Sequence, residues 1–197
     1  ITMCKMLKED VRTSHIPIIL LTAKDSLQDK EEGYQVGADS YLTKPFSATL
    51  LHSRINNLLE SRKRLAERLN TNTPHHNMDE KRALLADSLN KLDNEFLEKI
   101  NRLIEDRSSE KIDIGYLADN MCMSKSTLYR KMKALTGLST NEYVRKIKMQ
   151  YAERLLLEGR YNVSEIAFRV GINSVVYFRQ CFKEEFGVLP SDYLKQP

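Results

Sequence analysis

The chain has 197 residues, of which 41% are hydrophobic and 29% are charged, and its formal net charge is +4. These ordinary globular values exclude wholesale disorder, and so small a charge does not by itself indicate nucleic-acid binding. The three cysteines, Cys4, Cys122 and Cys181, are far apart in the sequence. Their spacing argues against a disulfide framework and a zinc site, and favours a reducing compartment. We expect Cys122 and Cys181 to lie on helices as packed thiols and not as redox sensors. No apolar run approaches the roughly 18 residues that a membrane span needs.

The first 64 residues alternate strand signals with helix signals. The apolar run at residues 16–21 predicts a short strand that is buried on both faces, and a helical stretch follows near residues 27–35. Residues 38–43 are a second strand candidate, which Lys44 and Pro45 end before a helix begins near Ser47. Strand, helix, strand and helix in this order predict an α/β segment with parallel strands.

Residues 65–91 are highly charged and are interrupted by a polar stretch around Pro74. This composition favours a linker with helical flanks. The adjacent residues His75 and His76 have no other ligand residue nearby in the sequence, so a solvated linker is a better interpretation than a metal site. We therefore expect three regions, namely residues 1–64, a linker at 65–91 and a helical domain at 92–197.

The third region predicts one helix after another. Its first apolar stripe consists of Phe96, Ile100, Leu103 and Ile104 at helical spacing. Ser124 is a good N-cap, and two capping boxes are expected, each with a glutamate three residues after the cap. The remaining helix boundaries are expected at these positions: Ser139 with Glu142, Asn162 with Glu165, and Gly187 before Pro190.

Two pairs of short helices stand out in this region. Residues 114–121 and 124–135 form the first pair, and residues 163–170 and 174–186 form the second. Each pair has the helix-turn-helix pattern, in which the second helix lies in a major groove of DNA with its N-terminal side chains on base edges. A single match of this kind is weak, but two matches separated by one long amphipathic helix are a much stronger indication.

The spacing within the second helix of each pair predicts which face is exposed. Leu128 and Met132 should point inward in the first, as should Phe178 and Phe182 in the second. Arginine can donate two hydrogen bonds to guanine O6 and N7, and an exposed valine can contact a thymine methyl group. The side chains expected to face outward are Ser126, Tyr129, Arg130 and Lys133, and Val175, Val176, Arg179 and Lys183.

Positive charge is concentrated in one part of the helical region. Residues 120–160 contain nine basic and three acidic residues, a net charge of +6 against +4 for the whole chain. Such a segment predicts a surface patch that neutralises DNA phosphates. Helix N-termini at Ser139 and Thr140, and at Asn173 and Ser174, would add backbone N–H donors to phosphates.

The second pair carries a family resemblance. Its motifs are Ile166-Ala167, Val170-Gly171, Tyr177-Phe178, Cys181-Phe182-Lys183, Phe186-Gly187 and Pro190-Ser191-Asp192-Tyr193. On these motifs, residues 93–196 resemble the AraC/XylS helix-turn-helix domain, with Ile172 where the family usually has an aromatic residue. The resemblance implies a mainly α fold of seven helices, whose two recognition helices enter successive major grooves about one DNA turn apart, ~34 Å.

The same resemblance implies the residues that touch DNA, and it implies no catalytic residue, metal or cofactor. The base-contacting positions are Ser126, Tyr129, Arg130, Val175, Val176, Arg179 and Gln180. The phosphate-contacting positions that we expect are Ser124, Lys125, Lys133, Ser139, Thr140, Asn173, Ser174 and Lys183.

The front segment resembles the back half of a response-regulator receiver domain, a flavodoxin-like α/β fold. The resemblance rests on the strings HIPIILLTA at residues 15–23 and GADSYLTKPF at residues 37–46, and covers about residues 1–62. It implies phosphoryl-contacting roles for Thr22 and Lys44, a switch role for Tyr41, and a bond before Pro45 that is commonly cis. The first three strands and the phosphoacceptor aspartate are absent, so we expect these residues to be inert relics.

The missing strands have a physical consequence for the strand at residues 16–21. Receivers have the strand order 2-1-3-4-5, so this strand loses a neighbour. A bare apolar edge favours association. We therefore expect the strand to pair with its copy in a second chain, or the front segment to pack against the DNA-binding domain.

Together these features predict a cytoplasmic bacterial transcription regulator, the output end of a two-component protein. We expect the parent to be a response regulator or, as the favoured hypothesis, a hybrid sensor kinase. The kinase activity and the inner-membrane anchor of such a sensor would lie outside these residues. Double-stranded DNA is the expected partner, self-association through the front segment is expected, RNA polymerase is a further candidate, and no membrane contact is expected here. One alternative is an assembly module that dimerises without reading DNA. A phosphotransfer enzyme is a second alternative, which the missing acceptor aspartate and metal pocket oppose.

Overall fold

The computed structural model describes residues 1–23, 31, 33–70 and 90–193. Part of the helix expected near residues 27–35 lies outside the described residues. Most of the expected linker, with His75 and His76, also lies outside them.

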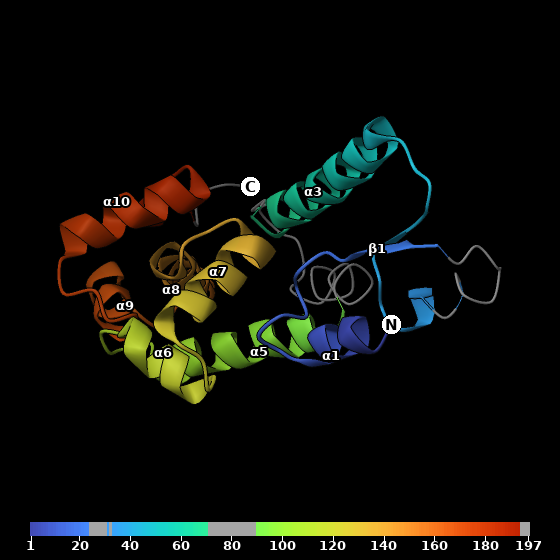
Figure 1. Cartoon of the computed structure of the whole chain (residues 1–197). Coiled ribbons are helices and arrows are strands. Elements are labelled where there is room, and N and C mark those ends of the chain that lie inside the picture. The colour runs from blue at the N-terminus through green and yellow to red at the C-terminus, as the bar shows by residue number, and fades with distance from the viewer. Residues whose placement is uncertain (24–30, 32, 71–89, 194–197) are drawn as a thin grey trace.

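The front segment, residues 1–70, contains α1 (Thr2–Glu9), β1 (Ile19–Thr22), β2 (Ser40–Thr43) and α3 (Ala48–Asn70). The two strands are parallel and in register from Ile19 opposite Ser40 to Thr22 opposite Thr43. This arrangement confirms the predicted parallel strands and the helix after them, although both strands are shorter than expected (Figure 1). The bond between Lys44 and Pro45 is cis, as the receiver resemblance implied.

The first strand is less buried than its apolar sequence predicts. Ile16, just before β1, is 45% exposed, and Leu21 within it is 43% exposed. Within the described residues, β2 is the only strand paired with β1. The prediction of a strand buried on both faces is therefore wrong, because such burial requires neighbouring strands and covering helices on both sides.

The remaining described residues form the expected succession of seven helices. These are α5 (Lys91–Asp106), α6 (Ile114–Asn120), α7 (Lys125–Thr136), α8 (Thr140–Leu157), α9 (Val163–Arg169), α10 (Val175–Phe186) and α11 (Pro190–Tyr193). We call α6 with α7 the first unit, and α9 with α10 the second unit. In Figure 1, α8 lies behind α7 and between the two units.

The helix boundaries follow the predicted caps. Ser124 Oγ accepts a hydrogen bond from the Thr127 backbone N–H at 3.1 Å, where α7 begins. Both predicted capping boxes, at Ser139 and Asn162, are formed. Gly187 ends α10 with a φ of 79°, in the left-handed region that glycine adopts without strain. Local capping chemistry thus places the start of each recognition helix.

Two hydrophobic cores lie along the long helix α8. The first joins α5, α6 and α7, and includes Leu128, Met132 and the α8 residue Ile147. The second joins α8, α9, α10 and α11, and includes Phe178 and Phe182. The inward positions predicted for both recognition helices are confirmed, since these four side chains are at most 1% exposed. One helix therefore anchors both units.

The front segment packs against the first unit. Val11 and Leu65 lie on the first core, Ala66 is 7% exposed, and α3 runs beside α7 (Figure 1). Of the two outcomes expected for this segment, packing on the helical domain is therefore the one observed. Because α3 continues to Asn70, residues 65 and 66 form part of this contact and not of an open linker.

A buried ionic network crosses this contact. The ammonium of Lys131, on α7, pairs with the carboxylate of Asp93 on α5, and both side chains are fully buried. Ser14, in the loop before β1, donates to Asp93 Oδ1 at 2.7 Å and accepts from Lys131 Nζ at 2.8 Å. Asn90 Nδ2 also donates to the Ser14 carbonyl oxygen at 3.1 Å. The rear of α7 is thus bonded to the front segment.

Candidate nucleic-acid interface

The outer face of α7 carries the side chains expected on base edges. Ser126, Tyr129 and Arg130 are all exposed, with 47% of Tyr129 accessible. They lie within the first two turns, because Ser124 caps the helix immediately before Lys125. The buried residues Leu128 and Met132 hold the opposite face of α7 against the core, which leaves this face free.

The outer face of α10 differs in one respect from the prediction. Val176, Arg179 and Gln180 are exposed, and Val176 is 77% accessible. Val175 is half-buried and packs on the second core, so the predicted pair of exposed valines reduces to one. Val175 is the first residue of α10, three before Phe178, and this helical spacing turns it toward the core.

The residues expected to contact phosphates divide into two groups. Six of them are exposed on or next to the recognition helices: Ser124, Lys125, Lys133, Asn173, Ser174 and Lys183. Ser139 is half-buried, and its hydroxyl accepts from the Glu142 backbone N–H. Thr140 is 1% exposed, so only its backbone, and not its hydroxyl, is suited to a phosphate contact.

The predicted basic patch is smaller than the sequence indicates. Of the nine basic residues at positions 120–160, three are buried: Lys131, Lys146 and Lys148. Lys148 Nζ donates to the Glu110 carbonyl oxygen at 2.7 Å, and burial lowers the pKa of this lysine. Lys146 lies 3.6 Å from Glu185. Counting charges along the sequence missed these burials because each partner is distant in the sequence.

The recognition helices also differ in charge. The sequence of α7 contains no acidic residue, and Lys125, Arg130 and Lys133 are exposed on it. In α10, Arg179 and Lys183 are accompanied by Glu184 and Glu185. The α7 surface is therefore better suited to phosphate attraction, which depends on net positive charge.

The turns that precede the recognition helices use different residues at one position. Gly171 has a φ of 68°, and a Cβ there would lie 2.8 Å from the carbonyl oxygens of Ser108 and Glu110. The corresponding residue of the first unit is Cys122, which has a φ of 53° and is exposed. The prediction that Cys122 is a packed thiol is wrong, because it lies in the turn and not on a helix. Cys181 is buried, as expected.

One contact on the α10 surface was not predicted. Gln180 Nε2 donates to Glu184 Oε1 at 3.1 Å, and Glu184 Oε2 lies 3.7 Å from Arg145 Nη1 on α8. The spacing of four residues between Gln180 and Glu184 is the signal that could have revealed it, because such residues are neighbours on a helix.

The structure brings two of the predicted receiver residues together. Thr22 and Thr43 end neighbouring strands, and the Lys44 backbone N–H donates to the Thr22 carbonyl oxygen at 2.7 Å. The ring of Tyr41 lies against Gly33, where a Cβ would be 3.0 Å from Tyr41 Cδ2. Thr22 and Lys44 thus meet at the carboxyl ends of the strands, the edge at which parallel α/β sheets bind ligands.

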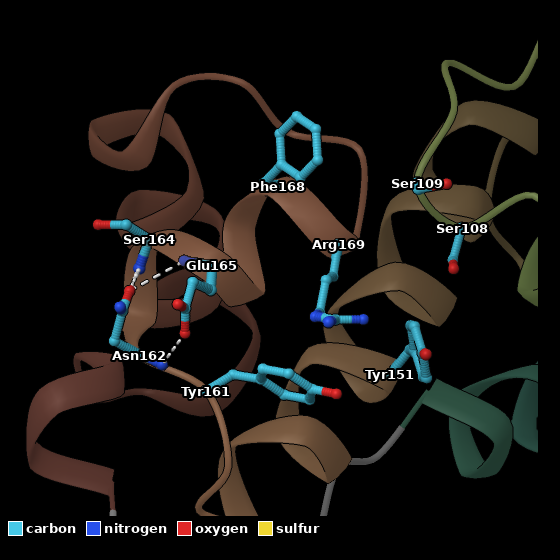
Figure 2. Close-up of a pocket in the computed structure, with 9 residues that line it drawn as sticks. All are labelled: Ser108, Ser109, Tyr151, Tyr161, Asn162, Ser164, Glu165, Phe168 and Arg169. Carbon is cyan, nitrogen blue, oxygen red and sulfur yellow. Dashed lines mark hydrogen bonds between the residues drawn. The ribbon is translucent and has the colours of Figure 1, made fainter.

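A pocket of about 690 Å³ lies beside the second unit, away from the predicted contact residues. Figure 2 shows it between α9, α8 and the connection from α5 to α6. The Arg169 guanidinium extends into it over the Tyr161 ring, 3.8 Å from the centroid, toward Tyr151. On the facing connection lie Ser108 and Ser109. None of the nine lining residues belongs to the predicted DNA surface, so the pocket is a separate feature.

Comparisons with known proteins match the two ends of the chain to two different families. The family model described as a response regulator receiver domain matches residues 1–56, and one described as a helix-turn-helix domain matches residues 117–196. The chain is 36% identical over 192 residues to Histidine kinase P4 from Formosa agariphila, a match that covers 97% of the chain and 14% of that protein. No helix among the described residues is both long and apolar enough to cross a membrane.

Two further matches concern the helical domain alone. The DNA-binding dual transcriptional regulator Rns of Escherichia coli is 32% identical over 98 residues, which are 50% of this chain and 37% of Rns. The solved C-terminal domain of AraT, a response regulator from Geobacillus stearothermophilus, is 30% identical with a TM-score of 0.46, covering 51% of this chain and 84% of that one. The chain thus spans well under half the length of the two curated relatives, Histidine kinase P4 and Rns. It joins part of a response regulator receiver domain to a helix-turn-helix domain of the AraC type.

Proposed function

We propose that this chain is the sequence-specific DNA-binding output end of a two-component protein. The observation that carries the proposal is the presence of two helix-turn-helix units on one long helix, each with exposed side chains at its reading positions. These are Tyr129 and Arg130 on α7, and Arg179 and Gln180 on α10. These side chains can bond base edges, and both units present them at the same face of the second helix.

The proposal assigns the remaining sites in the same way. Ser126, Val175 and Val176 complete the base-contacting set, with half-buried Val175 limited to its exposed part. Phosphates are contacted by Ser124, Lys125, Lys133, Ser139, Asn173, Ser174 and Lys183, and by the backbone of Thr140. The receiver segment is assigned to residues 1–64 and the DNA-binding domain to residues 92–197. The linker between them begins after α3 ends at Asn70. Thr22, Tyr41 and Lys44 act as receiver switch residues only in a longer parent.

The parent, in this proposal, is a hybrid sensor. Its histidine kinase activity and inner-membrane anchor lie outside these residues, and its output domain contacts RNA polymerase as well as DNA. The near-complete match to part of a protein named as a histidine kinase supports this layout. Because the matched part is 14% of that protein, the activities of the parent have to be tested on the parent itself.

Selection from random duplex DNA with the 197-residue chain tests the proposal. We expect a bipartite site whose halves are about one helical turn apart. Arg130→Ala and Arg179→Ala should each relax one half-site at a cost of ~1–3 kcal/mol. Arg102→Ala is the matched control, because Arg102 is exposed on α5 and pairs with Glu98. Binding without sequence preference would contradict the proposal.

A second function is favoured by a specific observation: Ile16 and Leu21 are exposed, and β2 is the one strand that pairs with β1 among the described residues. We propose that this edge mediates self-association, which would place two output domains on repeated DNA sites. A charged residue on an exposed strand opposes such pairing. Sedimentation equilibrium should therefore show dimers for the wild type and a weaker dimer for Leu21→Lys. A wild-type chain that stays monomeric at high concentration would rule out this role.

A further inference from the structure

We propose that Glu184 is a specificity-determining positioning residue, which holds the Gln180 amide in the orientation that reads adenine. This inference rests on the proposed function, because it assumes that α10 lies in a major groove. It extends that function by assigning a base to one position of the second half-site.

The geometry fixes the glutamine from one side. Gln180 Nε2 donates to Glu184 Oε1 at 3.1 Å, one helical turn further along α10. Glu184 is itself held, since its other carboxylate oxygen lies 3.7 Å from the Arg145 guanidinium on α8. A chain of contacts therefore links Arg145 on α8, through Glu184, to Gln180 on the exposed face of α10.

The chemistry of the pair determines which way the amide faces. An ionised carboxylate only accepts hydrogen bonds, so it is the NH₂ group of Gln180 that faces Glu184, and the carbonyl oxygen that faces away. One N–H is used by Glu184. The other N–H and the carbonyl oxygen remain, side by side, as one donor and one acceptor.

That pair of groups matches one base in the major groove. Adenine presents the N7 acceptor next to the N6 amino donor, and a glutamine amide can bond both. Guanine presents two acceptors, N7 and O6, so it would leave the Gln180 carbonyl oxygen without a donor. An amide that is held in one orientation should therefore favour adenine over guanine more strongly than a freely rotating one.

The first unit supports this interpretation by contrast. Fifty residues earlier, Arg130 occupies the position of Gln180, and Ala134 occupies the position of Glu184. A guanidinium carries only donors, so turning it over changes nothing that a base can detect. Glu184 is therefore present in the second unit, where the Gln180 amide has a donor group and an acceptor group. The first unit has no carboxylate at this position, and its Arg130 guanidinium has donors only.

The charge on Glu184 would ordinarily oppose its place near DNA. Its contact with Arg145 supplies a nearby positive charge that reduces this repulsion. The neighbouring Glu185 lies 3.6 Å from Lys146, so it carries the same formal charge on the same helix with a different partner. Glu185→Ala is therefore a matched control for loss of one negative charge.

The test uses the 197-residue chain and its selected site. The Gln180→Ala variant first identifies the base pair that Gln180 reads. Competition between duplexes that differ at that pair then gives the preference for adenine over guanine. We expect the wild type and Glu185→Ala to prefer adenine by roughly tenfold or more, as one bidentate contact provides. Glu184→Ala should lose most of that preference while keeping the preferences at every other position.

A double variant separates positioning from a direct contact. In the Gln180→Ala background, replacing Glu184 should leave the base preference unchanged, because nothing remains to be positioned. If Glu184→Ala keeps the adenine preference, or if Gln180 reads another base, the inference is wrong while the proposed function stands. If the wild type selects no site at all, the proposed function fails and takes the inference with it. Circular dichroism of each variant checks that α10 remains folded.

Discussion

The two helix-turn-helix units are close copies that differ in how their interiors are completed. With an offset of 50 residues, Ser124 and Ser174 cap recognition helices of 12 residues each, and a left-handed glycine ends both. Tyr143 and Tyr193 also correspond: the first donates to Asn101 and the second to Glu153, and burial raises the pKa of Tyr143 to about 12. The frame of the unit is therefore fixed by local caps and inward-facing residues.

The difference lies at one inward position of the recognition helix. In the first unit it is Lys131, whose charge is satisfied by Asp93 and by Ser14 of the front segment. In the second unit it is Cys181, which lies among the aromatic rings of the second core. The comparison teaches that one buried side chain decides what completes the core of such a unit. Cys181 packs within the core of its own domain, whereas Lys131 also bonds to a residue of the front segment.

The largest expected effect comes from Asp93→Ala. It leaves the Lys131 ammonium buried without its counter-charge, which should reduce the free energy of unfolding by ~3–5 kcal/mol. Cys181→Ala, which changes the second-unit residue at the position of Lys131, should cost about 1 kcal/mol. Urea unfolding measures both. Replacing the pair together, as Asp93→Leu with Lys131→Met, should recover most of the loss. Equal losses at the two positions would contradict the asserted difference between the units.

How far the sequence predicts this molecule is best seen in the same residues. The caps at Ser124 and Ser139 were predicted because a cap depends on neighbours three residues away. Lys131 was counted as surface charge, because its partners lie 38 and 117 residues away in the chain. The spacing of Lys131 from Leu128 and Leu135 places it at the edge of the inward-facing stripe. Its equivalent in the second unit is Cys181, and this comparison is the signal that could have indicated that Lys131 is buried.

The second expected effect is a pH dependence that arises from His15, in the front segment where it packs against the first unit. His15, beside Ser14, is 8% exposed, and burial, followed by the nearby charge of Lys131, lowers its pKa from 6.5 to about 4. Between pH 6.5 and about pH 4, His15 is therefore protonated in the unfolded chain and neutral in the folded chain. The stability present above pH 6.5 should fall by roughly 3 kcal/mol as the pH decreases to about 4.

Comparison with His15→Asn isolates this contribution from the other groups that titrate in acid. Chemical denaturation at pH 7 and at pH 4.5 should show the wild type losing more stability than the variant. Parallel losses in the two proteins would mean that His15 is not excluded from water in the folded chain.

The third prediction tests the likeness of the units. Ser124→Ala and Ser174→Ala each remove a side-chain acceptor from a backbone N–H at the start of a recognition helix. Each should reduce stability by about 1 kcal/mol, and each Gly replacement by only a few tenths. Thermal unfolding should give similar shifts for the two alanine variants. A large difference would show that the caps are not equivalent.

The smallest effect in free energy concerns charge. Because α7 has no acidic residue, Lys125→Ala should lower the slope of log affinity against log salt by about 0.9, and leave base preference unchanged. Lys183→Ala, on α10 with its two glutamates, should change the slope less. Titration of the selected site from 50 to 200 mM salt, roughly the range over which phosphate contacts dominate, measures both slopes.

The reading surface shows a similar limit of sequence reasoning. The exposure of Tyr129, Arg130, Arg179 and Gln180 followed from helical periodicity, because buried neighbours fix the opposite face. The partial burial of Val175 did not follow, since at the start of a helix a shift of one residue decides whether a side chain contacts the core. Helical periodicity predicts which side of a helix is exposed. Whether the first residue of the helix belongs to that side depends on how the preceding turn packs.

The contact between Ser14 and Lys131 also bears on modularity. Ser14 lies in the part of the chain that matches the receiver model, and Lys131 lies in the part that matches the helix-turn-helix model. A graft of this output domain onto another receiver would need a hydroxyl at the place of Ser14 and apolar side chains at those of Val11 and Leu65. The helical domain can thus be exchanged between proteins only if the residues of this contact are carried along with it.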